Sequence, residues 1–313
     1  MKWIALDGGT TNTRLRLMEA DTLLAEEKRP VGAGDTARTG SNAQLKAAVR
    51  DGLRALLGSG AGAERNAEVI VASGMIGSEL GLYTIPHLRA PAGAAELAAA
   101  GELVQLPEIT PIPFFFIPGV KNAADDRLDL MRGEETECLG LMAQLGITGS
   151  LTAMLPGTHN KLIRVRDGRI TACYTAMSGE ILSVIAEQTL LKNALPEKWP
   201  LAQRTELRAG CRDAQQYGMM HAMFHVRMMQ TQLHTTPEQR FSYFLGAGLA
   251  DDLKLLTCFA GVDPVVIAGS DPMKTAFADL IGAFCPNPVR LADSATASRS
   301  TVAGAYRIWL LRK

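Results

Sequence analysis

Leu6-Asp7-Gly8-Gly9-Thr10-Thr11-Asn12-Thr13-Arg14 is the stretch of sequence that decides the fold. Residues 3–6 before the turn are an apolar run that predicts a buried strand, and residues 13–19 alternate as a second strand does. The two glycines permit a tight turn between these strands. Because tight turns at strand ends present successive backbone N–H groups, they bind anions. The stretch therefore predicts a β-hairpin whose turn can hold an anionic group such as phosphate.

A second copy of this turn lies in the other half of the chain. The sequence Gly157-Thr158-His159-Asn160 repeats the pattern Gly-Thr-x-Asn of residues 9–12, again between two predicted strands. The stretch 69–74, a predicted strand over 69–72 and the two residues after it, is likewise matched by 265–270, with a predicted strand over 265–268. Either turn alone reads as an ordinary hairpin turn. Together the matches predict a duplicated α/β chain with a first domain over 1–147, a second over 148–295, and a C-terminal helix over 296–313 that returns to the first domain.

The composition narrows the class of protein. The chain has 313 residues, of which 47% are apolar, and its formal net charge is zero. This length fits two domains, and the charge balance argues against a nucleic-acid binder, which shows a basic stripe. No apolar run reaches the roughly 18 residues of a membrane span. The five dispersed cysteines and the early Asp7 predict a reduced, cytoplasmic protein without a signal peptide.

The remaining pattern predicts mainly helices after the second turn. Helical periodicity covers residues 178–193, 213–234 and 241–256. His221 and His225 are four residues apart, a spacing that can bind a metal, but their methionine-rich context favours a core helix.

The two turns differ in ways that suggest chemistry. Asp7 precedes the first turn, whereas Leu155 stands at the matching position of the second. A single carboxylate beside a phosphate turn suits Mg²⁺ bound through water, because Mg²⁺ takes one or two carboxylates plus phosphate oxygens. Lys161 in the second copy could neutralise phosphate charge or be a solvated hairpin lysine. His159 could donate to a phosphate or cap the turn, and the turn is favoured.

Several motifs beyond the first turn resemble one family. Leu155-Pro156-Gly157-Thr158-His159-Asn160-Lys161 and Met131-Arg132-Gly133-Glu134-Glu135-Thr136 are similar to motifs of the 2-oxo-3-deoxygalactonate kinases, a branch of the actin/hexokinase-like superfamily. Ala72-Ser73-Gly74-Met75-Ile76-Gly77-Ser78 and Ser178-Gly179-Glu180 also resemble that branch. Ile267-Ala268-Gly269-Ser270 resembles the superfamily's adenosine motif. The resemblance covers nearly the whole chain.

This resemblance implies two ribonuclease H-like α/β domains with a nucleotide cleft between them. It implies transfer of a phosphoryl group from ATP, with Mg²⁺, to the 6-hydroxyl of 2-oxo-3-deoxygalactonate in galactonate catabolism. The residues expected to bind the ATP phosphates are Gly8, Gly9, Thr10, Thr11, Asn12, Gly157, Thr158, His159 and Lys161. Gly269 and Ser270 are expected to bind adenosine, and Asp7 the metal.

The general base and the substrate site remain open at this stage. Phosphoryl transfer to an alcohol is helped by a carboxylate near the hydroxyl. Glu134 at the start of a predicted helix is the first candidate and Asp129 the second. The other acids in this region are Asp125, Asp126 and Glu135. The substrate carboxylate calls for an arginine, which can bind it bidentately, and the candidates are Arg132, Arg14 and Arg89. Ser73, Gly74 and Met75 follow a strand end and are expected to contact the substrate.

Three other functions are compatible with parts of the pattern. One is a kinase of a neutral hexose or hexosamine on the same fold. Another is a non-catalytic sugar-sensing regulator, although such regulators carry an N-terminal helix-turn-helix and this sequence starts at a strand. A third is a phosphatase or NTPase without an organic acceptor. The expected partners are a small sugar acid and ATP, with no nucleic acid and no membrane, and the sequence leaves a homodimer open.

Overall fold

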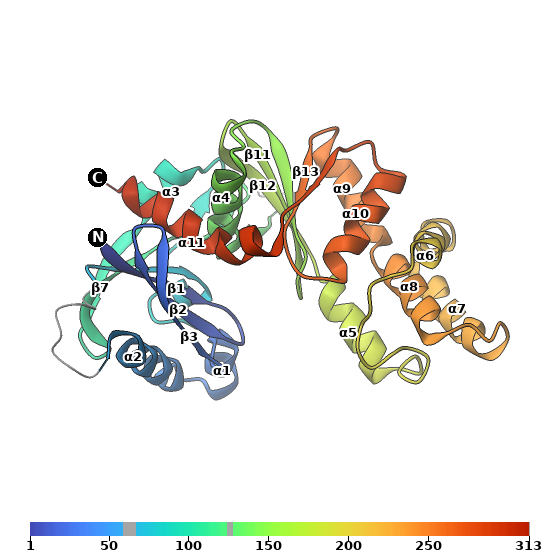
Figure 1. Cartoon of the computed structure of the whole chain (residues 1–313), viewed down its shortest axis with the longest axis horizontal. Coiled ribbons are helices and arrows are strands. Elements are labelled where there is room, and N and C mark those ends of the chain that lie inside the picture. Colours follow the sequence, from blue (N-terminus) through green and yellow to red (C-terminus); the bar gives the residue numbers. More distant parts are fainter. Residues whose placement is uncertain (59–66, 124–127, 313) are drawn as a thin grey trace. The chain divides into compact units, whose positions relative to one another are not determined.

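The computed structural model describes residues 1–58, 67–123 and 128–312. The chain divides into two compact units (Figure 1). The first comprises Met1–Thr148, Asp167–Cys173 and Ser298–Lys313, and the second comprises Gly149–Arg166 and Tyr174–Ala297.

The first unit is built on a six-stranded sheet ordered β3-β2-β1-β4-β7-β6. Its strands are β1 (Lys2–Gly8), β2 (Thr13–Glu19), β3 (Thr22–Arg29), β4 (Ile70–Gly74), β6 (Glu102–Leu106) and β7 (Thr110–Phe116). A small sheet ordered β5-β8-β9 joins β5 (Leu88–Arg89), β8 (Val120–Lys121) and β9 (Leu130–Met131). The helices are α1 (Ala33–Thr39), α2 (Ala43–Leu57), the 3₁₀ helix η2 (Met75–Gly77), α3 (Ala94–Ala100), α4 (Glu134–Leu145) and α11 (Ser294–Leu310).

The second large sheet has five strands and the same topology. Its order is β12-β11-β10-β13-β14, with β10 (Leu151–Leu155), β11 (Asn160–Arg166), β12 (Arg169–Ala176), β13 (Val265–Ile267) and β14 (Val289–Leu291). Strand β10 pairs antiparallel with β11 and parallel with β13, as β1 does with β2 and β4. The repeated sequence pattern thus corresponds to a repeated strand arrangement, which confirms the predicted duplication.

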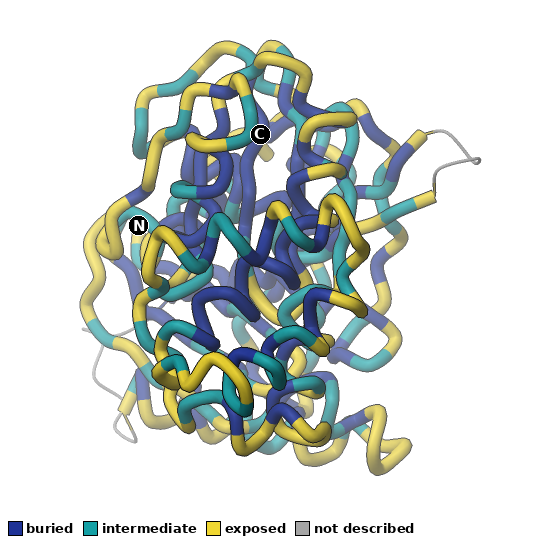
Figure 2. The backbone as a smooth tube through the Cα atoms, turned by 90° about the vertical axis from the view of Figure 1, so that its right-hand side faces the viewer, coloured by how far each residue is buried: buried dark blue, intermediate teal, exposed yellow. Residues whose placement is uncertain are grey.

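Apolar side chains bury both faces of the first sheet. On one face, residues of β1 and β2 share a core cluster with the apolar face of α2; these residues are Ile4, Leu6, Leu15, Leu17, Leu45, Val49 and Leu53. On the other face, Trp3 stacks on Tyr306 of α11 at 5.3 Å between ring centroids, and Phe115 contacts Trp309 at 5.2 Å. Buried residues concentrate along the strands, where the tube in Figure 2 is dark blue. The sheet therefore holds its strand ends in fixed positions.

Helices α4 and α11 cross at backbone contact. A Cβ added to Gly140 would lie 1.8 Å from the carbonyl oxygen of Ser300, and one added to Gly304 would lie 1.9 Å from that of Thr136. Because no other side chain fits at this distance, both glycines are required. The crossing fixes the start of α4 against the C-terminal helix.

In the second unit, two of the predicted helices are wrong because each is divided in the structure. Its helices are α5 (Ser178–Gln188), α6 (Arg204–Tyr217), α7 (Met219–Thr231), α8 (Pro237–Gly248), α9 (Ala250–Ala260) and α10 (Met273–Phe284). The helix predicted over 213–234 is two helices, because Gly218 has a φ of 90° that ends one and begins the next. The helix predicted over 241–256 is divided at Leu249 between α8 and α9.

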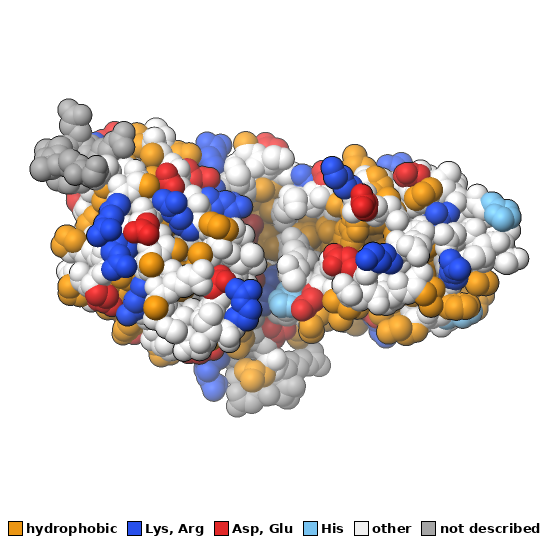
Figure 3. Space-filling model, turned by 90° about the horizontal axis from the view of Figure 1, so that it is seen from below, with side chains coloured by type: hydrophobic (Ala, Val, Ile, Leu, Met, Phe, Trp, Pro, Cys, Tyr) orange, Lys and Arg blue, Asp and Glu red, His pale blue; other side chains and the backbone are white. Residues whose placement is uncertain are grey.

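Two observations bear on the predicted surroundings of the protein. Within the described ranges, no helix combines the length and the apolar character needed to cross a membrane. Acidic and basic side chains are interspersed on the face shown in Figure 3, in keeping with the net charge of zero.

Candidate active site

Three glycines bring the strand ends of the first unit close together. A Cβ on Gly8 would lie 2.6 Å from Cβ of Ile76, and one on Gly74 would lie 2.6 Å from the carbonyl oxygen of Gly8. Gly133, just before α4, has a φ of 113°, and its Cβ would lie 3.1 Å from Cα of Gly74. Only glycine allows this approach. The result is that the end of β1, the end of β4 and the start of α4 meet.

Asp7 lies at this meeting point. It pairs with Arg14 of β2 and with Ser73 of β4 in the sheet register. Burial raises the pKa of the Asp7 carboxyl above its usual range, the charges of Arg14 and Arg16 oppose this rise, and Glu134 adds to it. The last effect shows that Asp7 and Glu134 are electrostatic neighbours. A carboxylate that is buried and close to another acid is stabilised in its charged form by a nearby cation.

The start of α4 supplies three more acids. Glu134 accepts a hydrogen bond from the backbone N–H of Arg132 at 3.0 Å. Glu135 is fully buried and accepts from the N–H of Gly133, at 2.8 and 3.0 Å, and from the hydroxyl of Thr136 at 3.0 Å. Burial raises the pKa of Glu135 to about 7 and that of Glu137 to about 8, and Glu134 adds to both shifts. Glu134 is thus the candidate base that the fold places beside Asp7.

The other candidate bases lie elsewhere or outside the described residues. Asp129 precedes β9, and its carboxylate accepts from the N–H of Leu130 at 2.7 Å. Its backbone carbonyl accepts from the N–H of Asn122 at 2.9 Å, which ties it to the small sheet. Asp125 and Asp126 fall in the segment that the structure does not describe.

The three candidate arginines differ in their surroundings. Arg132 donates from Nη2 to the carbonyl of Ile85 at 2.8 Å and lies 3.1 Å from Nδ1 of His87. Its Nη1 is buried and has no hydrogen-bond partner among the described residues, and burial lowers its pKa. Arg14 lies beside Asp7 and forms a loose ion pair with Glu26 at 3.9 Å. Arg89, on β5, donates to the carbonyl of Ala123 at 3.4 Å. Two of the three thus lie near the acidic cluster.

Ser73, Gly74 and Met75 lead from β4 into η2. Ser73 is buried and lies opposite Asp7, and the carbonyl of Met75 accepts from the hydroxyl of Ser78 at 2.7 Å. These residues border the glycine contact described above, as expected for residues at a strand end.

The turn over residues 9–12, the first of the two turns expected to bind phosphate and here named the first phosphate turn, is held by main-chain hydrogen bonds. The N–H of Gly9 donates to the carbonyl of Asn12 at 2.9 Å. The start of α1 packs on the same turn, because Ala33 and Gly34 donate to the carbonyls of Gly9 and Thr10 at 3.0 and 2.8 Å. The side chains of Thr10 and Thr11 are exposed. The turn is therefore ordered, with its two hydroxyls accessible.

The turn over residues 157–160, the second of the two turns expected to bind phosphate and here named the second phosphate turn, contacts the start of α5. Glu180 donates its N–H to the carbonyl of Thr158 at 2.8 Å, and a Cβ on Gly179 would lie 2.0 Å from the carbonyl oxygen of Gly157. The carboxylate of Glu180 lies 2.8 Å from Nε2 of His159. His159 therefore caps the turn through α5, although its side chain remains half exposed.

Lys161 is buried, so the alternative of a solvated hairpin lysine is wrong. Its side chain belongs to β11, is 7% exposed and donates to the hydroxyl of Thr175 on β12 at 2.6 Å. A lysine with its stem buried and its ammonium beside a strand end is a fixed positive charge close to the turn.

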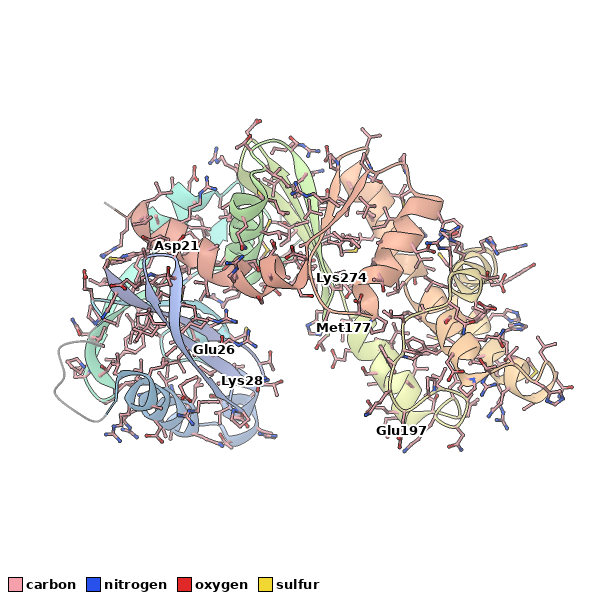
Figure 4. The ribbon with its side chains drawn as sticks, viewed as in Figure 1. Asp21, Glu26, Lys28, Met177, Glu197 and Lys274 are labelled. Carbon is pink, nitrogen blue, oxygen red and sulfur yellow. The ribbon has the colours of Figure 1, made fainter. Side chains whose placement is uncertain are left out.

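A cavity of about 330 Å³ opens beside this turn, within the second unit. Turn residues, one side of α5, Trp199 and the start of α10 line it: Gly157, Thr158, Gly179, Glu180, Ser183, Val184, Glu187, Gln188, Trp199 and Met273. Gly269 lies nearby, since its Cβ would be 3.2 Å from the carbonyl oxygen of Pro156. Figure 4 labels Met177 before α5 and Lys274 on α10, the two helices of this wall. The volume falls at the lower end of small-molecule sites.

The sequence motifs contain four residues of the cavity wall, Gly157, Thr158, Gly179 and Glu180, but not the rest of it. Trp199 lies in a segment between α5 and α6, and Val184 reads as an ordinary helix residue, so neither carries a motif. Met273 lies three residues after the sequence that resembles the adenosine motif, and this proximity is the sequence signal that could have assigned it to the cavity.

His221 and His225 each lie against a tyrosine ring. Among residues 1–58, 67–123 and 128–312, no cluster of three or more His, Cys, Asp or Glu side chains could hold a metal ion. His221 contacts Tyr217 at 5.8 Å between ring centroids, and His225 contacts Tyr243 at 5.3 Å. These contacts of both histidine rings are with tyrosine rings.

Comparison with known proteins identifies the family. The family model described as 2-keto-3-deoxy-galactonokinase matches residues 7–308. The chain belongs to this family. It is 30% identical over 99% of its length to a protein of Rhizobium meliloti (strain 1021) named as a probable 2-dehydro-3-deoxygalactonokinase, of which it covers 98%. It is 31% identical over 78% of its length to the 2-dehydro-3-deoxygalactonokinase of Escherichia coli (strain K12), of which it covers 76%.

Solved structures agree with this membership of the 2-keto-3-deoxy-galactonokinase family. A 2-dehydro-3-deoxygalactonokinase protein from Sinorhizobium meliloti superposes with a TM-score of 0.79 at 27% identity, covering 97% of this chain and 98% of that one. The activator of 2-hydroxyisocaproyl-CoA dehydratase from Clostridium difficile, solved with bound ADPNP, superposes with a TM-score of 0.53 at 12% identity, covering 100% and 96%. The second likeness concerns the fold alone and confirms the predicted actin/hexokinase-like ATPase fold.

Proposed function

We propose that this chain transfers the γ-phosphoryl group of ATP to the 6-hydroxyl of 2-keto-3-deoxygalactonate, in galactonate catabolism. The family assignment supports an ATP-dependent sugar kinase. The observation that carries the residue-level proposal is the glycine contact of the first unit, where the end of β1, which carries Asp7, meets the start of α4, which carries Glu134. Asp7 is suited to the metal-bound phosphates and Glu134 to the acceptor hydroxyl.

The chemical step assigns a role to each group. The acceptor oxygen attacks the γ-phosphorus, a new O–P bond forms, and the bond to the β,γ-bridging oxygen breaks to release ADP. Glu134 takes the proton of the hydroxyl. Lys161 and the N–H groups of both turns stabilise charge on the phosphates, since phosphoryl transfer depends on positioning and electrostatics.

Asp7 is suited to Mg²⁺ bound through water. This ion takes few protein carboxylates and completes its shell with phosphate oxygens and water. When bound, Mg²⁺ would neutralise phosphate charge. Burial and, to a lesser degree, Glu134 raise the pKa of Asp7, so a cation beside it would stabilise its charged form.

The nucleotide is assigned to the cavity beside the second turn. Gly157 and Thr158 at one side of the cavity suit the phosphates, and Trp199, Val184 and Met273 offer apolar surface to the base. Gly269 and Ser270 are assigned to the adenosine because they adjoin Pro156 and α10.

Arg132 is the first choice for the substrate carboxylate. Its unpaired Nη1 leaves hydrogen-bonding capacity, and its backbone N–H binds the candidate base. Ser73, Gly74, Met75 and Arg14 complete the assigned substrate surface. A cytoplasmic location and a homodimer remain predictions.

An acceptor comparison tests the function. ADP release is measured with 2-keto-3-deoxygalactonate, galactose, glucose and N-acetylglucosamine at equal concentrations, and without acceptor. A site built around an arginine leaves it unpaired when a neutral sugar binds, so kcat/KM should favour the acid by on the order of 10³-fold or more. Turnover of a neutral sugar without the acid would support a hexose kinase instead. ADP release without any acceptor would indicate an NTPase, and nucleotide-free sugar binding alone would indicate a regulator.

The arginine assignment needs its own comparison. Arg132→Ala should reduce the preference for the acid at least tenfold, because a charged hydrogen bond to the carboxylate is lost. Arg89→Ala is the matched control, since Arg89 lies on the small sheet. If both variants keep the wild-type preference, Arg14 becomes the candidate.

A further inference from the structure

A buried carboxylate lies behind the second phosphate turn. Asp252, on α9, is 2% exposed. Its Oδ1 accepts from Nδ2 of Asn160 at 3.0 Å, and its Oδ2 accepts from the hydroxyl of Ser178. Asn160 begins β11 and Ser178 begins α5. One side chain therefore joins the two segments that meet at the turn.

The network reaches the turn through Asn160. The N–H of Gly157 donates to Oδ1 of Asn160 at 3.1 Å. The first turn is closed differently, because Gly9 donates to the main-chain carbonyl of Asn12. The two copies of Gly-Thr-x-Asn thus share an asparagine but use it in different ways. The second turn depends on a side chain, and that side chain depends on Asp252.

Burial raises the pKa of the Asp252 carboxyl, and the hydrogen bonds from Ser178 and Asn160 oppose this rise by stabilising its ionised form. The ionised carboxylate determines the direction of the hydrogen bonds in this network. It can only accept, so Asn160 must present its amide hydrogens to Asp252 and Ser178 must donate its hydroxyl. This leaves the Asn160 carbonyl oxygen facing the N–H of Gly157. An asparagine at position 252 could donate as well as accept, and the orientation of the Asn160 amide would no longer be fixed.

The segments joined by Asp252 are the ones that line the cavity. Gly157, Thr158, Gly179 and Glu180 are wall residues, whereas Asp252 is not among them. The contact between the segments is tight, because a Cβ added to Gly179 would lie only 2.0 Å from the carbonyl oxygen of Gly157. A shift of the turn relative to α5 would change the wall on both sides.

We propose that Asp252 is a positioning residue for the nucleotide: through Asn160 and Ser178 it holds the second phosphate turn against the start of α5. It acts without touching the nucleotide. This role rests on the proposed use of the cavity for ATP, and it predicts a defect in nucleotide binding that leaves acceptor binding intact.

The test uses the full chain and measures ADP binding by calorimetry, followed by KM for ATP and for the sugar acid. Asp252→Asn should weaken ADP binding and raise KM for ATP by about tenfold or more, since hydrogen bonds to a charged group are lost. KM for the acceptor should stay within about twofold. Asp251→Asn is the matched control, because this neighbouring acid on α9 is exposed.

Two further variants keep the test decisive. Ser178→Ala removes one hydroxyl and should give a smaller defect of the same kind, and it decides the matter if Asp252→Asn does not fold. Asn160→Ala combined with Asp252→Asn should cost less than the sum of the single changes, as expected for one network. Wild-type ADP affinity in folded Asp252→Asn, or equal changes in KM for both substrates, would overturn the proposal. ADP binding needs no acceptor, so this result is separate from the outcome of the acceptor comparison.

Discussion

The two turns differ at one telling position: Asp7 precedes the first turn, whereas Leu155 precedes the second. This difference predicts that Asp7 serves the metal-bound phosphates. Asp7→Asn keeps the shape of the side chain and removes its charge. We expect turnover to fall by on the order of 10²-fold or more, which corresponds to a few kcal/mol of transition-state stabilisation. Steady-state kinetics at saturating Mg²⁺ and ATP measures this change. Asp21→Asn, at an exposed position (Figure 4), is the control. Near-wild-type turnover in folded Asp7→Asn would remove Asp7 from the mechanism.

Glu135 should make the free energy of unfolding depend on pH. Its pKa is about 7 in the folded protein, mainly because it is buried, against an ordinary value of 4.5. Between these values the folded protein holds a proton that the unfolded chain has released. Stability therefore falls as pH rises through this window, by roughly 3 kcal/mol for this group. Burial of Glu137, whose pKa is about 8, acts in the same sense.

Glu135→Gln removes one of these two contributions. Urea unfolding of wild type and variant at pH 5, 6, 7 and 8 should show a smaller loss of stability in the variant, while Glu137 retains part of the slope. Glu197→Gln, at an exposed position labelled in Figure 4, is the control. Parallel pH profiles of wild type and Glu135→Gln would contradict the expectation.

The sequence singles out candidate site residues that belong to local motifs. It does not single out the residues that hold those motifs in place from elsewhere in the chain. Asp7 and Glu134 belong to local patterns, because a strand end and a helix start are visible in the sequence. Asp252 lies far along the chain from Asn160, and the pattern of α9 reads only as an amphipathic helix. Its pairing with Asn160 arises from tertiary packing, which no local pattern encodes.

At the scale of elements, the crossing of α4 and α11 depends on its glycines. A Cβ at Gly304 would lie 1.9 Å from the carbonyl of Thr136, so Gly304→Ala must push the helices apart. We expect a loss of about 1–3 kcal/mol, as for other overpacked sites. Gly282→Ala on α10 is the control, because nothing lies within 4 Å of its Cβ, and it should stabilise the helix by up to about 1 kcal/mol. Thermal denaturation compares the two, and equal melting temperatures would contradict the packing argument.

Element prediction succeeded where periodicity was unbroken and failed where a single residue interrupted it. The start of α4 at Glu134 and the extent of β2 agree with the pattern. The helix predicted over 213–234 failed because apolar spacing continues through Gly218, whose positive φ becomes visible only in the folded backbone. The Asp167-Gly168 turn between β11 and β12 has φ of 48° and 71°, and its Asp-Gly pair is a hairpin signal that the predicted elements did not include.

At the scale of the whole molecule, the duplication gives each phosphate turn to a different compact unit. If both turns bind ATP, each unit must contact the nucleotide. We therefore expect the units to close around ATP by a hinge motion. Small-angle scattering should give a smaller radius of gyration with a non-hydrolysable ATP analogue plus sugar acid than for the free protein. The sugar acid alone is the control, because it does not reach the second turn in the proposed arrangement. Asp252→Asn should need more analogue for the same decrease, since its second turn is no longer fixed. An unchanged radius at saturating analogue and sugar acid would count against closure and would leave each turn to act within its own unit.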